Sequence, residues 1–396
     1  MREILLLCEY PTLNGGERSM LATLDGVRAA GFTPVIMAPA QGPLADALAA
    51  RNVELLPFEC RTTDGTRRPQ NHLRDELTRL LQHRRPALLH ANSLAMSRLS
   101  GPVAADLGIP SLSHLRDIIN QSAQAIADLN RHPRLLAVSH AVREFHVAAG
   151  LAAEKVHMLY NGVDLETFRP RTPTGYLHRE LGLPPESPLI GTIGQIGLRK
   201  GHDVLLRAAA AIADRLPNVH YLIVGQRHSE KDESRRFEQD LHDASSGPLA
   251  GRVHFLGFRN DVARLLGELM LLVHPARQEP LGRVLLEAAA AGLSIVATDV
   301  GGTPEILPPD QDAARLVPSG DAAALGAAIV ELIGDPALRH RLGLAARRRA
   351  EDRFNIRDSV NALLGHYELL VSQHSASGKR SGVESPANRK NAASSP

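Results

Sequence analysis

The sequence has few cysteines, no long apolar run and almost no excess charge of either sign. Its two cysteines, Cys8 and Cys60, lie in no Cys-x-x-Cys pair or Cys/His cluster, so no zinc site is indicated. Sparse cysteine is typical of a reducing compartment. No run of about 18 apolar residues is present, and the apolar run at 4–7 is too short for a signal peptide. We therefore expect a cytoplasmic protein, with peripheral attachment at the inner membrane face as the alternative.

Charge and length further limit the class of protein and the number of domains. The 45 Lys and Arg residues stand against 43 Asp and Glu residues, for a formal net charge of +2. This balance argues against a protein that binds nucleic acid through bulk charge. At about 150 residues per domain, 396 residues correspond to two or three domains with sizeable cores.

Short apolar runs alternate with longer segments of helical periodicity. In the first half, the runs expected to be strands are 3–8, 35–38, 53–56, 87–90, 135–139 and 156–160. A second series comprises 189–193, 219–224, 253–256, 269–273 and 294–297. Such alternation predicts parallel sheets covered by helices. The predicted fold class is α/β, with two Rossmann-like parallel-sheet domains that face a central cleft, where a ligand would lie.

Composition suggests where the domains begin and end. We expect an N-terminal domain over 1–167 and a second domain over 189–355, joined by the proline-rich linker 168–188. A C-terminal amphipathic helix is expected over 356–372. The tail 373–396 has almost no large apolar residue, so we expect it to be disordered.

The segment 279–287 follows an expected strand and opens an expected helix. Glu279 falls in the loop at the carboxyl end of the strand, and Glu287 lies two turns into the helix. The N–H groups of a helix N-terminus favour phosphate, and ionised carboxylates accept hydrogen bonds from hydroxyl groups. The segment therefore indicates a site for a sugar diphosphate, with two solvated glutamates as the alternative.

The segment 194–203 also joins an expected strand to a helix. Its glycines permit close backbone approach to a ligand, and Arg199 and Lys200 would neutralise phosphate charge. The spacing is not that of a G-x-x-x-x-G-K-[ST] phosphate loop, and no G-x-G-x-x-G dinucleotide fingerprint is present. The alternative is a solvated pair of cations at the start of a helix.

Other loops after expected strands carry residues that suit a ligand. Gly15 and Gly16 would let backbone N–H groups face an anion, although a plain tight turn explains them equally well. The loop 257–261 would hold a base through main-chain groups, and the loop 301–305 would reach a diphosphate or sugar. His90, His114 and His274 end or follow strands, where most histidines have only structural roles.

Six motifs occur in a characteristic order. They are Gly15-Gly16-Glu17-Arg18, Val138-Ser139-His140-Ala141, Tyr160-Asn161-Gly162-Val163-Asp164, Lys200-Gly201, residues 279–298 and Gly301-Gly302-Thr303-Pro304-Glu305. Over about residues 3–370, the chain resembles the retaining GT-B glycosyltransferases of family four, also called group 1. The resemblance implies the two-domain GT-B fold, with a C-terminal helix that returns to the N-terminal domain, the acceptor side.

The resemblance also implies roles for individual residues. Glu279 would contact the donor sugar as a catalytic residue, and His114 would lie beside the transferred sugar. Lys200 would pair with the diphosphate and Glu287 with the ribose hydroxyls. The implied donor-binding residues are Gly16, Gln195, Arg199, Lys200, Phe258, Leu281, Gly282, Val284 and Glu287. The chain departs from the family pattern at Gln195, where the family often has an arginine as a second cation that pairs with the phosphates. Arg199 is a candidate to supply that missing charge.

By the same resemblance, the enzyme would transfer a sugar with retention and without a metal or other cofactor. The expected donor is a UDP- or GDP-sugar, and the acceptor is a glycan, a lipid or a small metabolite. No nucleic-acid partner is expected, and membrane contact would be weak and peripheral. Three other readings remain: a sugar-nucleotide epimerase or phosphorylase, a sugar-nucleotide-binding scaffold without activity, and a dinucleotide oxidoreductase.

Overall fold

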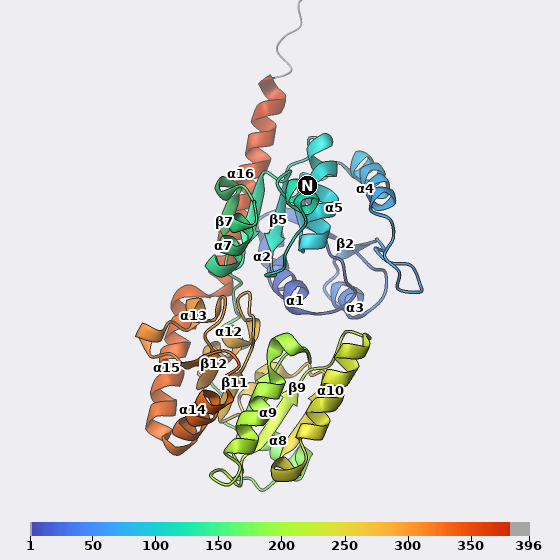
Figure 1. The fold of residues 1–396 in the computed structure, drawn as a ribbon. Coiled ribbons are helices and arrows are strands. Elements are labelled where there is room, and N and C mark those ends of the chain that lie inside the picture. The colour runs from blue at the N-terminus through green and yellow to red at the C-terminus, as the bar shows by residue number, and fades with distance from the viewer. Residues whose placement is uncertain (1, 381–396) are drawn as a thin grey trace, which may run out of the picture.

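The computed structural model describes residues 2–380, which form two α/β domains (Figure 1). The N-terminal sheet has seven parallel strands in the order β3-β2-β1-β4-β5-β6-β7. They are β1 (Arg2–Leu7), β2 (Phe32–Ala38), β3 (Glu54–Pro57), β4 (Leu88–Ala91), β5 (Ser111–Leu115), β6 (Arg134–Ala137) and β7 (Val156–Met158). The helices of this domain are α1 (Gly15–Leu21), α2 (Leu24–Ala29), α3 (Pro43–Ala49), α4 (Gln70–Arg84), α5 (Leu94–Asp106), α6 (Ala123–Leu129) and α7 (His140–Ala148).

The second sheet has six parallel strands in the order β10-β9-β8-β11-β12-β13. They are β8 (Leu189–Ile193), β9 (His220–Val224), β10 (Val253–Gly257), β11 (Leu271–His274), β12 (Ile295–Thr298) and β13 (Arg315–Val317). The helices are α8 (Tyr176–Leu181), α9 (His202–Ala211), α10 (Asp232–Ala244), α11 (Val262–Leu266), α12 (Arg283–Ala290), α13 (Thr303–Ile306), α14 (Ala322–Gly334) and α15 (Pro336–Arg353). The predicted fold class, two Rossmann-like parallel-sheet domains, is confirmed.

The strand order of each sheet determines where a ligand can lie. Leu5 of β1 pairs with Val35 of β2 on one side and with Leu89 of β4 on the other, and all three are buried. The order therefore reverses beside β1, and it reverses in the same way beside β8, which lies between β9 and β11. Ligands of open α/β sheets bind beyond the carboxyl ends of the strands at such switch points.

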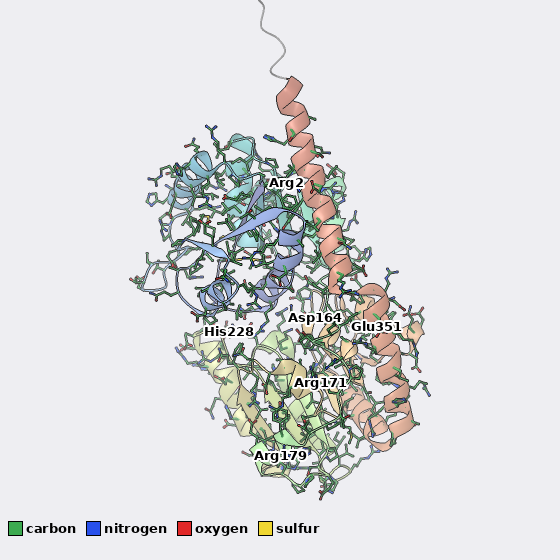
Figure 2. All side chains as sticks on the ribbon, turned by 180° about the vertical axis from the view of Figure 1, so that it is seen from behind. Arg2, Asp164, Arg171, Arg179, His228 and Glu351 are labelled. Atoms are coloured by element: carbon green, nitrogen blue, oxygen red, sulfur yellow. The ribbon has the colours of Figure 1, made fainter. Side chains whose placement is uncertain are left out.

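The last helix, α16 (Ile356–Arg380), starts at the second domain and runs back along the first (Figures 1 and 2). Its Tyr367 is fully buried and meets the ring of Phe32 edge-on, with centroids 5.8 Å apart. A Cβ on Gly26 of α2 would lie 2.4 Å from Val360 Cγ1, so only glycine permits this helix contact. The return of the C-terminal helix to the N-terminal domain is thus present in the structure.

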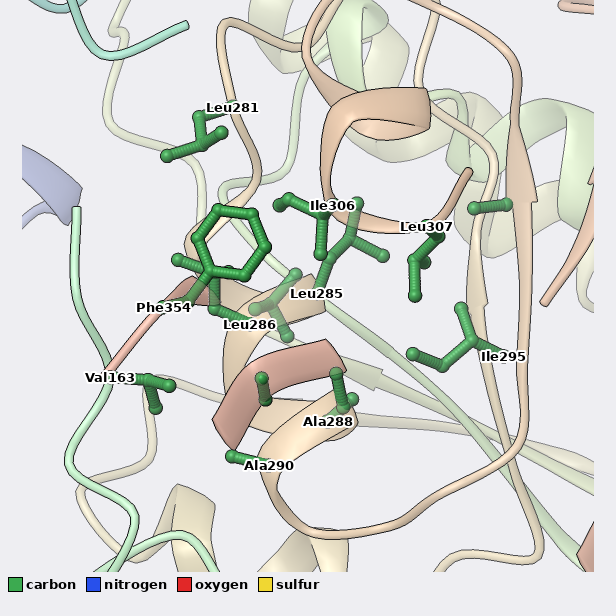
Figure 3. Packing of buried hydrophobic residues seen from close by; sticks show 14 of the residues in the cluster. Val163, Leu281, Leu285, Leu286, Ala288, Ala290, Ile295, Ile306, Leu307 and Phe354 are labelled. Atoms are coloured by element: carbon green, nitrogen blue, oxygen red, sulfur yellow. The ribbon is translucent and has the colours of Figure 1, made fainter. Parts of the chain in front are cut away.

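The chain crosses between the domains twice, and the two crossings are paired. The Val163 N–H donates to the Phe354 carbonyl at 2.7 Å, and the Ile356 N–H donates to the Val163 carbonyl at 3.0 Å. Phe354 is buried in a cluster that includes Val163 and Leu286 (Figure 3). Truncation of a buried phenylalanine to alanine lowers the free energy of unfolding by about 3–5 kcal/mol. We therefore expect Phe354 to contribute strongly to the packing between the domains.

Three local features differ from the sequence prediction. The expected linker 168–188 contains helix α8, whose Tyr176 and Leu177 are buried. Two strands lie outside the apolar runs given for the sequence: β5, which alternates Ser and Leu and was marked only through His114, and β13, which is only three residues long and begins with Arg315. Helix α16 continues to Arg380, so 373–380 are helical rather than disordered. The rest of the expected tail, 381–396, lies outside the described residues.

Candidate functional site

A buried cluster of three ionisable side chains joins the ends of β8 and β11. Lys200, at the end of the 3-10 turn η2 (Leu198–Lys200), places its Nζ 2.5 Å from Glu279 Oε2. His274, the last residue of β11, places its Nε2 2.8 Å from the same oxygen. Both Glu279 and His274 are buried. This contact brings the segments 194–203 and 279–287 together.

The protonation of the cluster follows from its surroundings. Burial favours the neutral form of Glu279, but Lys200 and the hydrogen bond from His274 outweigh it and hold the pKa of Glu279 well below its usual range. Burial, and then the charge of Lys200, lower the pKa of His274, although Glu279 opposes this. His274 is therefore neutral, and because a carboxylate only accepts, it donates from Nε2. The cluster is one cation, one anion and one neutral donor.

Glycines pack closely against the backbone of Glu279 and of the nearby Pro275. Gly301 has φ +52°, and a Cβ there would lie 2.0 Å from the Glu279 carbonyl oxygen. The Gly302 N–H donates to the same carbonyl at 2.9 Å. A Cβ on Gly201, at φ +69°, would lie 1.9 Å from the Pro275 carbonyl oxygen. These close approaches fix Glu279 and the Lys200 turn against each other, which is why both loops need glycine.

In the loop 301–305, which is expected to reach a diphosphate or sugar, the Glu305 side chain contacts the N-terminal domain. Its carboxylate accepts the N–H groups of His140 and Ala141 at 2.8 and 3.0 Å, and the Tyr160 hydroxyl at 2.8 Å. Glu305 therefore caps helix α7 across the domain boundary, where a negative charge suits the helix N-terminus.

Helix α12 carries the second acidic residue of the site. Arg283 Nε donates to Glu287 Oε1 at 2.7 Å, one helical turn away. Burial raises the pKa of Glu287, although the charges of Arg283 and of Arg18 oppose this. Arg283 Nη1 also lies 3.5 Å from Ser19 Oγ, in α1 of the other domain. Glu287 thus lies where the carboxyl edges of the two sheets meet.

The other predicted donor-binding residues surround these two clusters. Gln195, Arg199 and Phe258 are exposed, and the Phe258 ring lies 5.6 Å from the Arg18 guanidinium of the N-terminal domain. The charge of Arg199 contributes to the lowered pKa of Glu279, so it acts on the same cluster as Lys200. Three more residues, Leu281, Gly282 and Val284, lie between Glu279 and Glu287. The Leu281 and Val284 side chains are buried in the core, which leaves their main chain for a ligand.

His114 lies in the N-terminal domain, in a chain of buried polar contacts. Its Nδ1 is 2.8 Å from His90 Nε2 and 3.2 Å from Arg116 Nη2. His90 Nδ1 is 2.7 Å from the hydroxyl of Tyr367, on α16. Arg116 is held by Asn92 and Asn161, whose side-chain oxygens accept from its guanidinium at 2.9 and 2.8 Å.

These contacts allow one arrangement of protons. A guanidinium only donates, so His114 Nδ1 accepts from Arg116, and His90 must donate to the same atom from Nε2. His90 Nδ1 then accepts from the Tyr367 hydroxyl, and His114 carries its proton on Nε2. Burial, and then the charge of Arg116, lower the pKa of His90 to about 3 and that of His114 well below its usual value. Both rings are neutral, and His114 presents an N–H donor.

His114 also lies close to the domain boundary. Together with Ser19 and Asn161 it lines a cavity of about 20 Å³, enough for about one water molecule. Gly16 lies next to Arg116, because a Cβ on Gly16 would be 3.2 Å from Arg116 Cδ. Sequence reasoning missed Arg116 and Tyr367. The position of Arg116 at the end of β5 was the one available signal, and nothing local marks Tyr367.

The described residues 2–380 offer neither a metal site nor a membrane-spanning helix. No group of three or more His, Cys, Asp or Glu side chains in that range could hold a metal ion. None of its helices is long and apolar enough to cross a membrane.

Solved structures define the class of fold. Anabaena HepE in complex with UDP and glucose matches with a TM-score of 0.81 and 22% identity, over 92% of this chain and 99% of that one. Sucrose-phosphate synthase from Thermosynechococcus elongatus matches with a TM-score of 0.76 and 22% identity, over 94% and 100% of the two chains. The fold is that of the GT-B proteins, two facing Rossmann-like domains.

Sequence comparison identifies the family. The model described as Glycosyltransferase Family 4 matches residues 13–167, and the model described as Glycosyl transferases group 1 matches residues 187–335. The chain belongs to this family of glycosyltransferases, as the six motifs predict.

Curated relatives match over part of their length. The α-maltose-1-phosphate synthase of Mycobacterium tuberculosis is 32% identical over 234 residues, 56% of this chain and 59% of that protein. Spore coat protein SA of Bacillus subtilis is 30% identical over 226 residues, 55% and 59% of the two chains. The alignment thus covers about three fifths of the length of these relatives.

Proposed function

We propose that this protein transfers a sugar from a nucleotide-sugar donor to an acceptor hydroxyl, with retention at the anomeric carbon and without a metal ion. The observation that carries the proposal is the placement of Lys200, Glu279 and Glu287 at the switch point of the second sheet, facing the glycine loop of the first. Anionic and hydroxyl-bearing groups of a sugar nucleotide match these side chains in charge and hydrogen bonding.

Each residue has a proposed role. Glu287 would accept hydrogen bonds from the ribose hydroxyls, and Glu279 from hydroxyls of the transferred sugar. Lys200, Arg199 and the N-terminus of α12 would stabilise the charge on the departing diphosphate. They would thereby perform the role that a metal ion has in metal-dependent enzymes. His114 would donate from Nε2 to the transferred sugar, which makes it a hydrogen-bond donor rather than a base.

The proposed retaining transfer would proceed without a covalent intermediate on Glu279. Glu279 is engaged by both Lys200 and His274, so it is poorly suited to attack the anomeric carbon as a free nucleophile. The acceptor hydroxyl would instead approach on the face that the diphosphate leaves. Positioning and electrostatic stabilisation would then supply most of the rate enhancement.

The proposed donor is a UDP- or GDP-sugar. The structures similar to this chain include one in complex with UDP-glucose, and one curated relative is named as GDP-mannose-dependent. A glycan, a lipid or a small metabolite remains the proposed acceptor. The proposed location is cytoplasmic or peripheral at the inner membrane face.

A donor screen tests the proposal. UDP-, GDP-, ADP- and dTDP-sugars are added in EDTA and then in Mg²⁺, and the thermal unfolding midpoint is followed. A ligand at 100 times its Kd stabilises by about 2.7 kcal/mol. We expect one nucleotide class to raise the midpoint equally with and without metal. With the acceptor in hand, NMR of the product gives the anomeric configuration; inversion would refute the retaining part alone.

The second candidate is a sugar-nucleotide-binding protein without transferase activity. It is favoured by Gln195, which is neutral where the family often has a cation. Donor binding without turnover, together with turnover in a Gln195→Arg variant, would support it.

A further inference from the structure

A second cavity lies away from the proposed donor site, at the C-terminal end of α15. It has a volume of about 410 Å³ and lies between α15 and the turn η4 (Pro309–Gln311). Its lining residues are Gln311, Ala345, Arg348, Arg349, Asp352 and Arg353. None of them belongs to the clusters of Lys200, Glu279 and Glu287. The cavity is open to solvent and is far larger than the roughly 10–15 Å³ of such volume that one water molecule needs.

The charge around this cavity is not balanced. Three arginines line it against one carboxylate, that of Asp352. Within the described part of the chain, none of Arg348, Arg349 and Arg353 forms an ion pair. Their neighbours on the same helix do: Arg347 pairs with Glu351 at 2.6 Å, and Arg341 pairs with Asp312 at 3.0 Å. Three cations against one lining carboxylate leave an excess of positive charge, and a bound anion would relieve the repulsion among the arginines.

Arg349 is already fixed in position. Its Nη2 donates to the Glu305 carbonyl at 3.0 Å, and its guanidinium lies 5.7 Å from the ring centroid of Phe354. Its Nε is buried without a hydrogen-bond partner. Burial, and then the charge of Arg353, lower the pKa of Arg349, while Asp310 and Asp352 act in the opposite direction. The arginine thus loses little conformational entropy when a ligand binds.

From this cavity, its charge and the fixed Arg349, we infer a binding site for a phosphate group, held by Arg348, Arg349 and Arg353. Arginine is suited to this task because its planar guanidinium donates two parallel hydrogen bonds to a phosphate. The phosphate is that of a soluble phosphate monoester or of a lipid headgroup. The site is separate from the donor site and does not depend on the proposed transferase activity.

The test compares two variants that remove the same charge. Arg348 and Arg353 are exposed, so Arg348→Gln/Arg353→Gln should fold normally. Arg215→Gln/Arg236→Gln is the matched control, because both residues are exposed and make no side-chain hydrogen bond or ion pair in the described structure. Binding of glycerol 3-phosphate is measured by calorimetry at constant ionic strength, with UDP present to occupy the donor site. Vesicles of phosphatidylcholine with and without phosphatidic acid form a second arm, read by sedimentation.

We expect Arg348→Gln/Arg353→Gln to weaken phosphate binding at least about tenfold, while the control binds like the wild type. Loss in the calorimetric arm identifies a soluble monoester, and loss in the vesicle arm alone identifies a lipid headgroup. Equal binding by all three proteins in both arms, or no binding by the wild type in either arm, would overturn the inference. A failed donor screen would leave this result untouched, so the two proposals fail separately.

Discussion

The carboxyl edges of the two sheets differ in how they hold polar groups. The edge of the second sheet uses charge: Lys200 pairs with Glu279, and Arg283 pairs with Glu287. At the edge of the first sheet, the Tyr367 hydroxyl donates to His90, and both His90 and Arg116 donate to His114 Nδ1, so the two histidines form a neutral relay. The comparison teaches that the second sheet carries paired charges at its edge, whereas the first carries uncharged histidines whose protons are positioned by their neighbours.

We expect the largest effect on activity at the edge of the second sheet, called here the charged edge, where Lys200 pairs with Glu279. Lys200→Met removes the cation from the proposed diphosphate and from Glu279, so we expect the transfer rate to fall by about 10²–10³. The control is Lys231→Met, at an exposed lysine before α10. The measurement is the initial rate of nucleoside diphosphate release with a donor found by the screen. A Lys200→Met enzyme as fast as the control would remove Lys200 from the mechanism.

The edge of the first sheet, called here the neutral edge because His90 and His114 are uncharged, is tested by Tyr367→Phe. This substitution removes one hydroxyl and keeps the buried ring. His90 Nδ1 is left without its donor, and an unsatisfied buried acceptor costs about 1–3 kcal/mol. The free energy of unfolding in urea measures this, with Tyr10→Phe, at an exposed tyrosine, as the control. Nitrogen NMR of labelled histidines should still show an unprotonated Nδ1 on His114, because Arg116 remains. A protonated Nδ1 in the wild type would contradict the relay.

The two edges should also respond to acid in different pH windows. The pKa of His90 is lowered from 6.5 to about 3, so its contribution to stability is complete above 6.5 and is lost as the pH falls toward 3. Between pH 6.5 and 5 that loss amounts to about 2 kcal/mol. The pKa of Glu279 is lowered from 4.5, so its contribution is lost only below pH 4.5.

Urea unfolding of wild type, His90→Gln and the exposed control His72→Gln, at pH 7, 6 and 5, separates these windows. The His90→Gln variant should lose less stability between pH 7 and 5 than the other two proteins. Parallel losses in all three would show that His90 does not titrate as its burial requires.

The smallest effect is expected where the two domains touch. Glu305→Ala removes the cap of α7 and the partner of the Tyr160 hydroxyl, at a cost of about 0.5–2 kcal/mol. Glu233→Ala, at an exposed glutamate on α10, is the control, and the free energy of unfolding is again the measurement. An unchanged stability would mean that the domains are held together by the apolar cluster around Phe354 alone.

The sequence drew attention to the residues at the edge of the second sheet because they fall in two short segments, each of which joins an expected strand to a helix. A single loop and helix carry Glu279, Gly282 and Glu287, and a second short segment carries Lys200. Strand runs such as 189–193 were equally clear, because parallel strands buried on both faces are continuously apolar. Local pattern and local structure coincide in these places.

The sequence did not predict the contacts of the neutral edge, because the residues that form them lie far apart in the chain. His90 and Tyr367 are 277 residues apart, and only the return of α16 brings them together. Periodicity shows that Tyr367 belongs to an amphipathic helix, but not which strand that helix covers. The contact of Glu305 with helix α7 was not foreseen for the same reason: its partner His140 lies 165 residues earlier.

The most direct test of the central claim is a calorimetric titration with UDP, or with GDP if the screen selects it, in EDTA. Three proteins are compared: the wild type, Glu287→Gln and the exposed control Glu233→Gln. We predict saturable binding without metal by the wild type and the control, and binding at least about tenfold weaker for Glu287→Gln. Binding that needs Mg²⁺, or equal affinity in all three proteins, would contradict a metal-independent donor site at Glu287.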